Sequence, residues 1–337
     1  MSLNSTEYGP RDLKGYGKNT PDPQWPGGAK IAISIVLNYE EGSEVTPVNG
    51  DNVTETLGSE LGPGVPKMVG ERNVNMESLY EYGSRAGVWR ILRLLEEHNV
   101  RCTSYAVGHA LELNPEVAVA LEEAGHEVAS HGWRWVDRSD WTVEEEKENA
   151  KKAIKAIQNT VPSGKPPRGW YYGMVSGTKA GTRSRALIAE VFREEGIPLL
   201  WYSDDYSDDL PHWHVYNFPT LVPYPGGSKE EGLLIIPYTL DANDYRNARY
   251  SAFITPDDFA SYLISSFDEL YAEGCKGHAK MMSIGLHCRI IGRPGRIAGL
   301  RKFLEYAKAK EEGGVWFATR EEIAEHWKER FPYFPKS

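Results

Sequence analysis

The chain has 337 residues, of which 40% are hydrophobic and 26% charged, the composition of an ordinary globular protein that can bury a full core without disulfides or metals. Its 38 basic and 48 acidic residues give a formal net charge of −10, which argues against nucleic-acid binding, since nucleic-acid binders carry a basic face. The sequence shows no apolar run long enough for a membrane span, no signal-peptide pattern and only three widely spaced cysteines. We therefore expect a cytoplasmic protein whose partner is a small molecule, with no nucleic acid or membrane bound.

Strands and helices are predicted to alternate after a Pro-, Gly- and Asn-rich arm over residues 1–29. Runs of β-branched and other apolar residues are typical of buried strands, and they occur over residues 30–37, 100–107, 126–130, 197–202, 233–237, 280–287 and 315–318. Helical apolar spacing and capping signals predict helices over residues 83–98, 115–123, 142–159, 181–195, 255–274 and 295–312, with a last helix after Thr319.

This alternation predicts parallel β/α units, and no break in composition marks a second domain within residues 30–330. A doubly wound open sheet and a β/α barrel are both compatible with the pattern. In either α/β fold the active groups lie at the C-terminal ends of the strands. The segment 40–76 lacks a regular apolar period, and so long a loop in a compact domain usually has a functional reason.

Two adjacent carboxylates, Glu40 and Glu41, follow the first predicted strand. Neighbouring residues of an extended segment point in opposite directions, so one carboxylate is expected to face a cavity while the other turns aside. The pair would then supply a general base and a ligand or orienting group. The alternative interpretation is the solvated start of a loop.

Two histidines also follow predicted strands: His131, with Trp135 four residues later, and His287, followed by Arg289 and Arg293. Either histidine could be purely structural. Together with a carboxylate, however, they fit a reaction in which the carboxylate activates water and a histidine protonates the leaving group. The chain has no G-x-G-x-x-G, Walker A or G-x-S-x-G motif, so dinucleotide, phosphoryl-transfer and serine-hydrolase chemistry lose their usual support.

Two further segments are candidates for the walls of a pocket. Arg168, Trp170 and Tyr171 lie in an aromatic, glycine-rich stretch that would form either a pocket wall or an irregular turn. Asp205 lies in an acidic loop after the strand predicted over 197–202, and this loop would be either a cation site or simply solvated.

In their order and context these segments resemble the polysaccharide deacetylase superfamily, the NodB-homology group of carbohydrate esterases. The resemblance implies a single-domain α/β fold, a distorted (β/α)7-type barrel. The family's first motif supplies a general base and a metal ligand, which correspond to Glu40 and Glu41. Its late Leu-His motif supplies the general acid, which corresponds to His287, and its Arg-Pro-Pro-Tyr-type motif corresponds loosely to Arg168–Tyr171.

The family's metal site is an Asp-His-His set, and the matching positions here are Glu41, His131 and Trp135. A tryptophan cannot bind zinc, and a zinc site normally keeps three protein ligands and a water molecule. We therefore expect no cofactor and at most weak zinc binding, with Glu41 and His131 as the ligands if a metal binds. His131 would otherwise stabilise the oxyanion in place of the metal.

Several blocks narrow the resemblance to the cofactor-free allantoinase branch, whose members are often named urate catabolism or chitin deacetylase-like proteins: Asn38–Gly42, Ser130–Trp135, Ile236–Asp244 and Gly285–Arg296. This branch implies opening of the hydantoin ring of allantoin to give allantoate, with Glu40 or Glu41 as base and His287 as acid, and it implies a homotetramer. The alternatives are an N-deacetylase of chitin or peptidoglycan and a catalytically silent protein that binds a sugar or a ureide.

The same branch suggests how a small, flat and polar substrate would be held. Its pocket needs an apolar wall and paired hydrogen bonds. The residues expected to bind the substrate are Trp135, Trp170 and Tyr171 for the wall, Asp205 for ring N–H groups, and Arg168, Arg289 and Arg293 for carbonyl groups.

Overall fold

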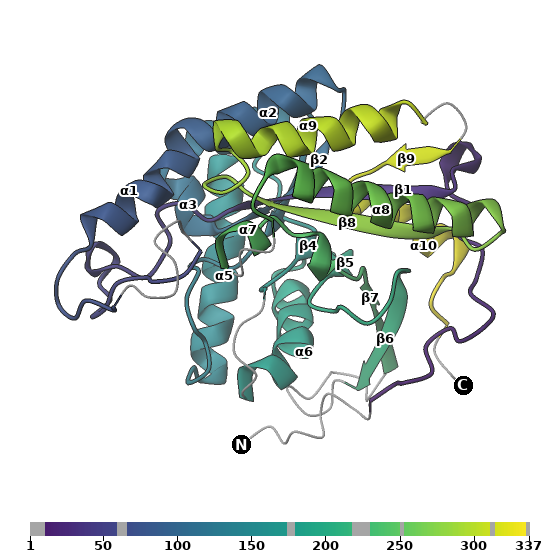
Figure 1. Cartoon of the computed structure of the whole chain (residues 1–337). Helices are drawn as coiled ribbons and strands as arrows, with labels where there is room; N and C mark the ends of the chain where they lie inside the picture. The colour runs from purple at the N-terminus through teal and green to yellow at the C-terminus, as the bar shows by residue number, and fades with distance from the viewer. Residues whose placement is uncertain are drawn as a thin grey trace.

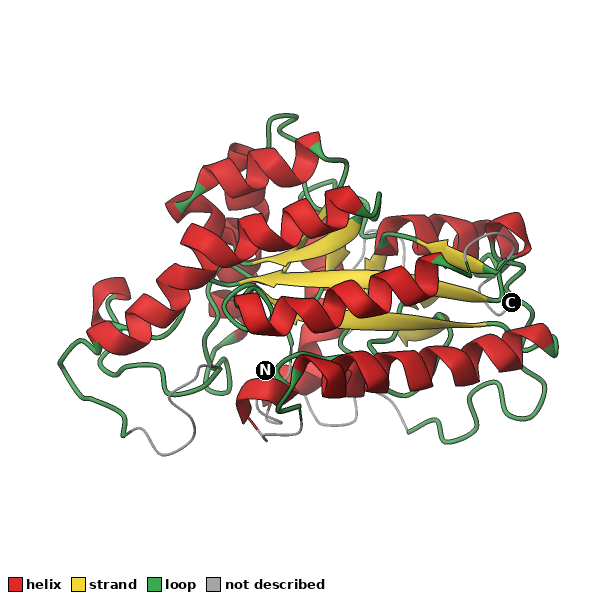
Figure 2. Cartoon of the chain, turned by 45° about the horizontal axis from the view of Figure 1, so that its top comes forward, coloured by secondary structure: helices red, strands yellow, loops and turns green. Residues whose placement is uncertain are grey.

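The computed structural model describes residues 11–58, 66–173, 179–217, 230–249, 253–310 and 314–334. A curled sheet forms the centre of the molecule, and helices pack around it (Figures 1 and 2). Its strands are β1 (Ile31–Tyr39), β2 (Cys102–Ala106), β3 (Glu127–Ser130), β4 (Gly169–Trp170), β5 (Trp201–Tyr202), β6 (His212–Asn217), β7 (Glu230–Ile235), β8 (Lys280–His287) and β9 (Val315–Phe317).

The strand order is β6-β7-β5-β4-β3-β2-β1-β8, with β9 paired to β1. Every strand pair is parallel except β6 with β7. An isolated parallel bridge between Asn243 and Gly285 links the segment after β7 to β8, at the side where the sheet curls toward closure. The predicted distorted β/α barrel is therefore confirmed, in the form of a half-barrel, and the open doubly wound sheet is not what forms.

The helices are α1 (Val74–Tyr82), α2 (Val88–Glu97), α3 (Gly108–Leu113), α4 (Pro115–Glu123), α5 (Val143–Thr160), α6 (Lys179–Glu194), α7 (Arg246–Arg249), α8 (Pro256–Cys275), α9 (Pro294–Lys308) and α10 (Arg320–Arg330). Three of them, α5, α8 and α10, begin with a complete capping box, in which a threonine and an acidic residue each bond the other's backbone N–H. No described helix is both long and apolar enough to cross a membrane.

Five elements were not predicted from the sequence as separate elements, namely α1, α3, β4, β6 and α7, and two of them have a plain physical reason. The helix predicted over 83–98 extends back to Val74, because the Asn73 side chain accepts the N–H of Met76 at 3.1 Å and caps an additional helix, α1. A π-helical turn over Gly83–Gly87 joins α1 to α2. The strand β6 was not predicted, because its sequence HWHVYN has no apolar run and its antiparallel pairing breaks the parallel pattern.

The N-terminal arm packs on its own chain over the residues that are described; residues 1–10 lie outside them. The Tyr16 hydroxyl donates to the Pro211 carbonyl at 2.5 Å, and the buried Trp25 ring donates to the Lys280 carbonyl at 2.9 Å. Trp25 also contacts Trp327 of α10, with ring centroids 6.2 Å apart. Trp25 and α10 thus close the end of the half-barrel at which the strands begin, called the base end below, and leave the opposite end for the site.

Candidate active site

A cavity of about 510 Å³ lies at the C-terminal ends of β1, β3 and β8. It brings together five of the candidate residues, namely Glu40, His131, Trp135, Tyr171 and His287. The other described residues that line it are Asn38, Leu57, Gly173, Leu240, Asp241, Asn243, Tyr245 and Arg246.

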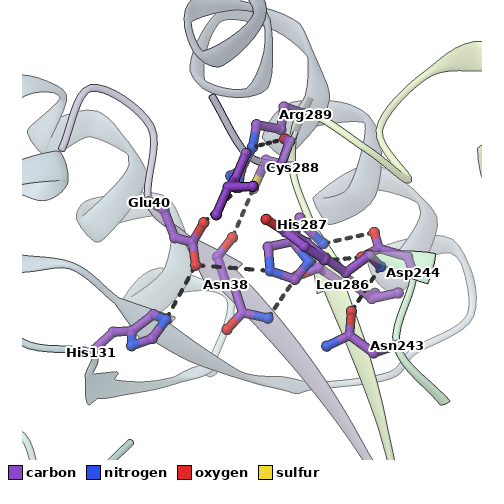
Figure 3. A network of polar contacts seen from close by, with 12 residues as sticks. Asn38, Glu40, His131, Asn243, Asp244, Leu286, His287, Cys288 and Arg289 are labelled. Carbon is purple, nitrogen blue, oxygen red and sulfur yellow. Dashed lines mark hydrogen bonds and ion pairs between the residues drawn. The ribbon is translucent and has the colours of Figure 1, made fainter. Parts of the chain in front are cut away.

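Glu40 is the centre of the polar network in this cavity (Figure 3). One carboxylate oxygen, Oε1, lies 3.2 Å from Nε2 of His131 and 3.8 Å from Nε2 of His287. The other, Oε2, accepts a 2.8 Å hydrogen bond from the guanidinium of Arg289. Burial alone would raise the pKa of the Glu40 carboxyl, but the charges of Arg289 and the two histidines outweigh it and hold this pKa well below its ordinary value.

His131 is held by both of its ring nitrogens. Nδ1 lies 2.9 Å from the carbonyl oxygen of Tyr171, which can only accept, so Nδ1 carries a hydrogen. Nε2 lies 3.2 Å from Oε1 of Glu40. The Tyr171 contact therefore fixes the ring so that Nε2 is presented to Glu40 and to the reacting centre.

His287 is oriented by a residue that the sequence did not single out, Asp244 (Figure 3). The Asp244 Oδ1 atom lies 2.7 Å from Nδ1 of His287, and Oδ2 accepts the backbone N–H groups of His287 and Ile291 at 2.8 and 3.1 Å. Asp244 is fully buried, and its carboxylate keeps the Nδ1 hydrogen in place, so Nε2 faces Glu40 and the cavity. This is the arrangement in which a histidine can exchange a proton with substrate.

Glu41 does not face the cavity. Its carboxylate accepts the N–H groups of Glu40, at 2.9 Å, and of Arg289, at 3.2 Å, and it lies so close to Gly83 that any side chain there would collide with it. Burial, its largest influence, raises the pKa of Glu41 despite the nearby Arg289. The structure thus separates the adjacent carboxylates as the alternation of an extended segment requires: Glu40 faces the cavity and Glu41 orders the backbone behind it.

The residues present do not fit the metal that the family resemblance implies. Glu41 points away, Trp135 has no nitrogen lone pair to offer, and Nε2 of His131 already contacts Glu40. Across the part of the chain that the structure describes, no three His, Cys, Asp or Glu side chains are grouped to hold a metal ion. The pair Glu41 and His131 therefore does not form a metal site in this geometry.

Two residues expected to bind substrate belong instead to other parts of the fold. Trp170 is completely buried against Tyr172 and Phe192, because it lies on the outward-facing side of β4. Arg168 precedes β4, at the base end, where its guanidinium pairs with Glu321 and Glu325 of α10. The neighbouring Tyr171 follows β4 and does line the cavity.

Three further candidates, Asp205, Arg289 and Arg293, do not line the cavity either. Asp205 pairs with Arg185 at 3.1 Å and accepts hydrogen bonds from Ser207. Arg293 directly precedes α9, and its guanidinium lies over the Tyr82 ring, 3.6 Å from its centroid.

Arg289 is 2% exposed and lies behind Glu40, so it acts on the carboxylate rather than on a ligand. Its Nε donates to the Gly58 carbonyl at 2.7 Å, and its guanidinium lies over the ring of Tyr80. The loop over 40–58 and helix α1 therefore fix Arg289, and Arg289 fixes Glu40, which gives this long loop a role.

Known proteins similar to this chain include polysaccharide deacetylases. A family model described as polysaccharide deacetylase matches residues 75–185. Over 329 residues the chain is 45% identical to a Schizosaccharomyces pombe (strain 972) protein that is provisionally named a polysaccharide deacetylase, and the match covers 97% of this chain and 99% of the other.

Two solved structures are similar over almost their whole length. One, from Pseudomonas aeruginosa PAO1, also bears the provisional name of a polysaccharide deacetylase; its TM-score is 0.84 at 44% identity, with 96% of this chain and 100% of that chain covered. The other is a PuuE allantoinase, with a TM-score of 0.84 at 46% identity and with 96% and 99% covered.

The fold and the site therefore define a hydrolase that acts on carbon–nitrogen bonds other than peptide bonds, the chemistry that deacetylases and allantoinases share. The chain belongs to the polysaccharide deacetylase family.

Proposed function

We propose that the protein opens the hydantoin ring of allantoin to give allantoate. The observation that carries this proposal is the position of Glu40, whose Oε1 faces both His131 and His287 in a cavity of about 510 Å³. A cavity of this size suits a small, flat molecule. The 46% identity to a PuuE allantoinase supports the same substrate.

In the proposed reaction Glu40 accepts a proton from water while the water oxygen attacks the ring carbonyl carbon. The carbonyl oxygen becomes an oxyanion, which an N–H of the His131 ring stabilises. When the carbon–nitrogen bond breaks, His287 donates a proton from Nε2 to the departing nitrogen, and Asp244 stabilises the charged imidazole beforehand. The products are a carboxyl group and a ureido group, so one water molecule is consumed, and the proton taken up by Glu40 replaces the one that His287 gave.

We further propose that this reaction needs no metal, because of the family's three ligand positions Glu41 faces away from the cavity and Trp135 has no nitrogen lone pair, which leaves only His131. Exhaustive dialysis against a chelator should leave the rate of allantoin hydrolysis unchanged. Recovery of a lost rate by added zinc or another divalent ion would contradict this proposal.

The second candidate is an N-deacetylase, which the names of the S. pombe and P. aeruginosa relatives favour. The test is to assay the purified protein with allantoin, following allantoate, and with chitotetraose and a peptidoglycan fragment, following acetate. We expect turnover of allantoin and little acetate. Acetate release without allantoin turnover would establish the deacetylase instead, and binding without either reaction would indicate a silent binding protein.

A further inference from the structure

We propose that Arg246 and Asp241 together recognise a ureido group on the part of the substrate that is not cleaved. This inference rests on the proposed function and deepens it, since it assigns the specificity of the same cavity. A ureido group presents a carbonyl oxygen flanked by N–H groups. A guanidinium can donate to that oxygen, and a carboxylate can accept from those N–H groups.

Both side chains line the cavity and come from a single segment after β7. Arg246 is the first residue of α7, and its Nε is buried with no hydrogen-bond partner. A buried donor without a partner costs stability unless a ligand satisfies it. Among the described residues that line the cavity, Arg246 is also the one arginine or lysine, because Arg289 lies behind Glu40.

Asp241 uses one carboxylate oxygen for a hydrogen bond within the protein, and both Asp241 and Arg246 lie near the ring of Tyr262. Oδ2 of Asp241 accepts a 2.7 Å hydrogen bond from the Tyr262 hydroxyl, and both Asp241 and Arg246 influence the pKa of Tyr262, which rises chiefly through this hydrogen bond. Tyr262 therefore holds the carboxylate in place.

The same segment connects recognition to the reacting centre. Asn243 bridges to Gly285 of β8, and the Asp244 N–H donates to the Gly285 carbonyl at 2.9 Å. Asp244 in turn orients His287. A substrate held by Arg246 and Asp241 is thereby positioned by the backbone segment that also orients the general acid, which is a favourable arrangement for aligning the cleaved bond.

The test compares allantoin with hydantoin, which has the same ring but no ureido substituent. In Arg246→Gln we expect the ratio of kcat/KM for allantoin to that for hydantoin to fall about 10- to 100-fold, the effect of one lost hydrogen bond to a charged group. The loss should appear mainly in KM for allantoin, while hydantoin is little affected. Asp241→Asn should lower the ratio less, and Arg246→Lys should restore part of it.

Arg168→Gln is the matched control, because Arg168 pairs with α10 at the base end, and its ratio should equal that of the wild type. An unchanged ratio in Arg246→Gln, or an equal loss for both compounds, would overturn this inference while allantoin turnover by the wild type upholds the proposed function. If the wild type hydrolyses neither compound, calorimetry gives the same ratio from binding constants. A wild type that does not bind allantoin would overturn the proposed function and this inference together.

Discussion

The two ends of the half-barrel are built from similar side chains and differ in what those side chains face. At the cavity end Arg289 donates to Glu40, whose other oxygen is directed at two histidines and a cavity. At the base end the buried Glu127 uses both oxygens on the protein itself, accepting from Thr103, Trp201 and the N–H of Glu321 at 2.7, 2.9 and 2.9 Å. A carboxyl group whose oxygens are all bonded by its own fold is structural, whereas one with an oxygen directed at a cavity can do chemistry.

The segment around β4 shows the same contrast within a few residues. Arg168 directly precedes β4, lies at the base end and pairs with α10. Tyr171 directly follows β4, lies at the cavity end and holds His131 through its carbonyl oxygen. Between them Trp170 packs outward. The two-residue strand β4 therefore separates a structural ion pair from the active site. Arg168 and Tyr171 have unrelated roles because they lie at opposite ends of this strand.

The largest difference between the two ends is expected when the proton-transfer groups of the cavity end are removed. Glu40→Gln and His287→Ala should each lower kcat by about 10²- to 10⁴-fold, as expected for loss of a positioned base or acid. Steady-state kinetics with allantoin measure the effect, and circular dichroism confirms the fold. Arg168→Ala at the base end should keep its activity; a comparable loss there would mean that the two ends are not functionally distinct.

Asp244→Asn tests whether the residue behind His287 acts through it. An asparagine can keep the backbone contacts of Oδ2, but its amide would no longer favour a hydrogen on Nδ1 of His287. We expect kcat to fall by about 10²-fold, at the low end of the range for a lost acid, with KM little changed. A normal kcat would show that Asp244 only stabilises the fold.

Removing the charge of Arg289 should shift the pH dependence of activity. The depressed pKa of Glu40 keeps its carboxylate ionised well into acid, and without Arg289 burial would dominate and raise that pKa. In Arg289→Met the acid limb of kcat/KM should therefore move upward by about 1–3 pH units. Arg289→Lys keeps the charge and should shift the limb less; coincident profiles for all three proteins would refute this account of Glu40.

The smallest effect concerns two buried carboxyls, one at each end. Burial raises the pKa of both Glu44 and Glu127 to about 7, from an ordinary value of 4.5. Their protonation therefore stabilises the fold fully below pH 4.5, and this contribution is lost as the pH rises through about 7. Glu44→Gln removes one such group, and Oε2 of Glu44 has no hydrogen-bond partner to lose.

We expect the Tm of Glu44→Gln to change less than that of the wild type between about pH 5 and pH 8. At the higher pH the free energy of unfolding of the variant should exceed that of the wild type by about 1–3 kcal/mol. Glu127→Gln is the counterpart at the base end. It should be destabilised across this range, because the amide cannot accept all three hydrogen bonds that Glu127 receives. Identical pH dependence in Glu44→Gln and wild type would contradict the raised pKa of Glu44.

The sequence by itself determined most of the strands and helices after residue 30 and the positions of the capped helices α5, α8 and α10, because apolar periodicity and capping pairs act over a few neighbouring residues. It did not reveal the short elements α3, β4 and α7, nor α1 and β6. It also led to Glu40, His131 and His287, since in parallel β/α units polar residues after a strand gather at one edge of the sheet. Trp135 and Tyr171 lie in the cavity for the same reason.

Only the tertiary structure decided which charged groups belong to the site. Asp244, Arg246 and Asp241 lie in a segment with no strand of its own, and their placement depends on the bridge between Asn243 and Gly285. The roles of Trp170, Arg168, Asp205 and Arg293 depend on which end or face of the sheet each one reaches, and on partners distant in sequence such as Glu321. Local patterns carry no information on such pairings, because the free energy that fixes them comes from contacts between segments rather than within them.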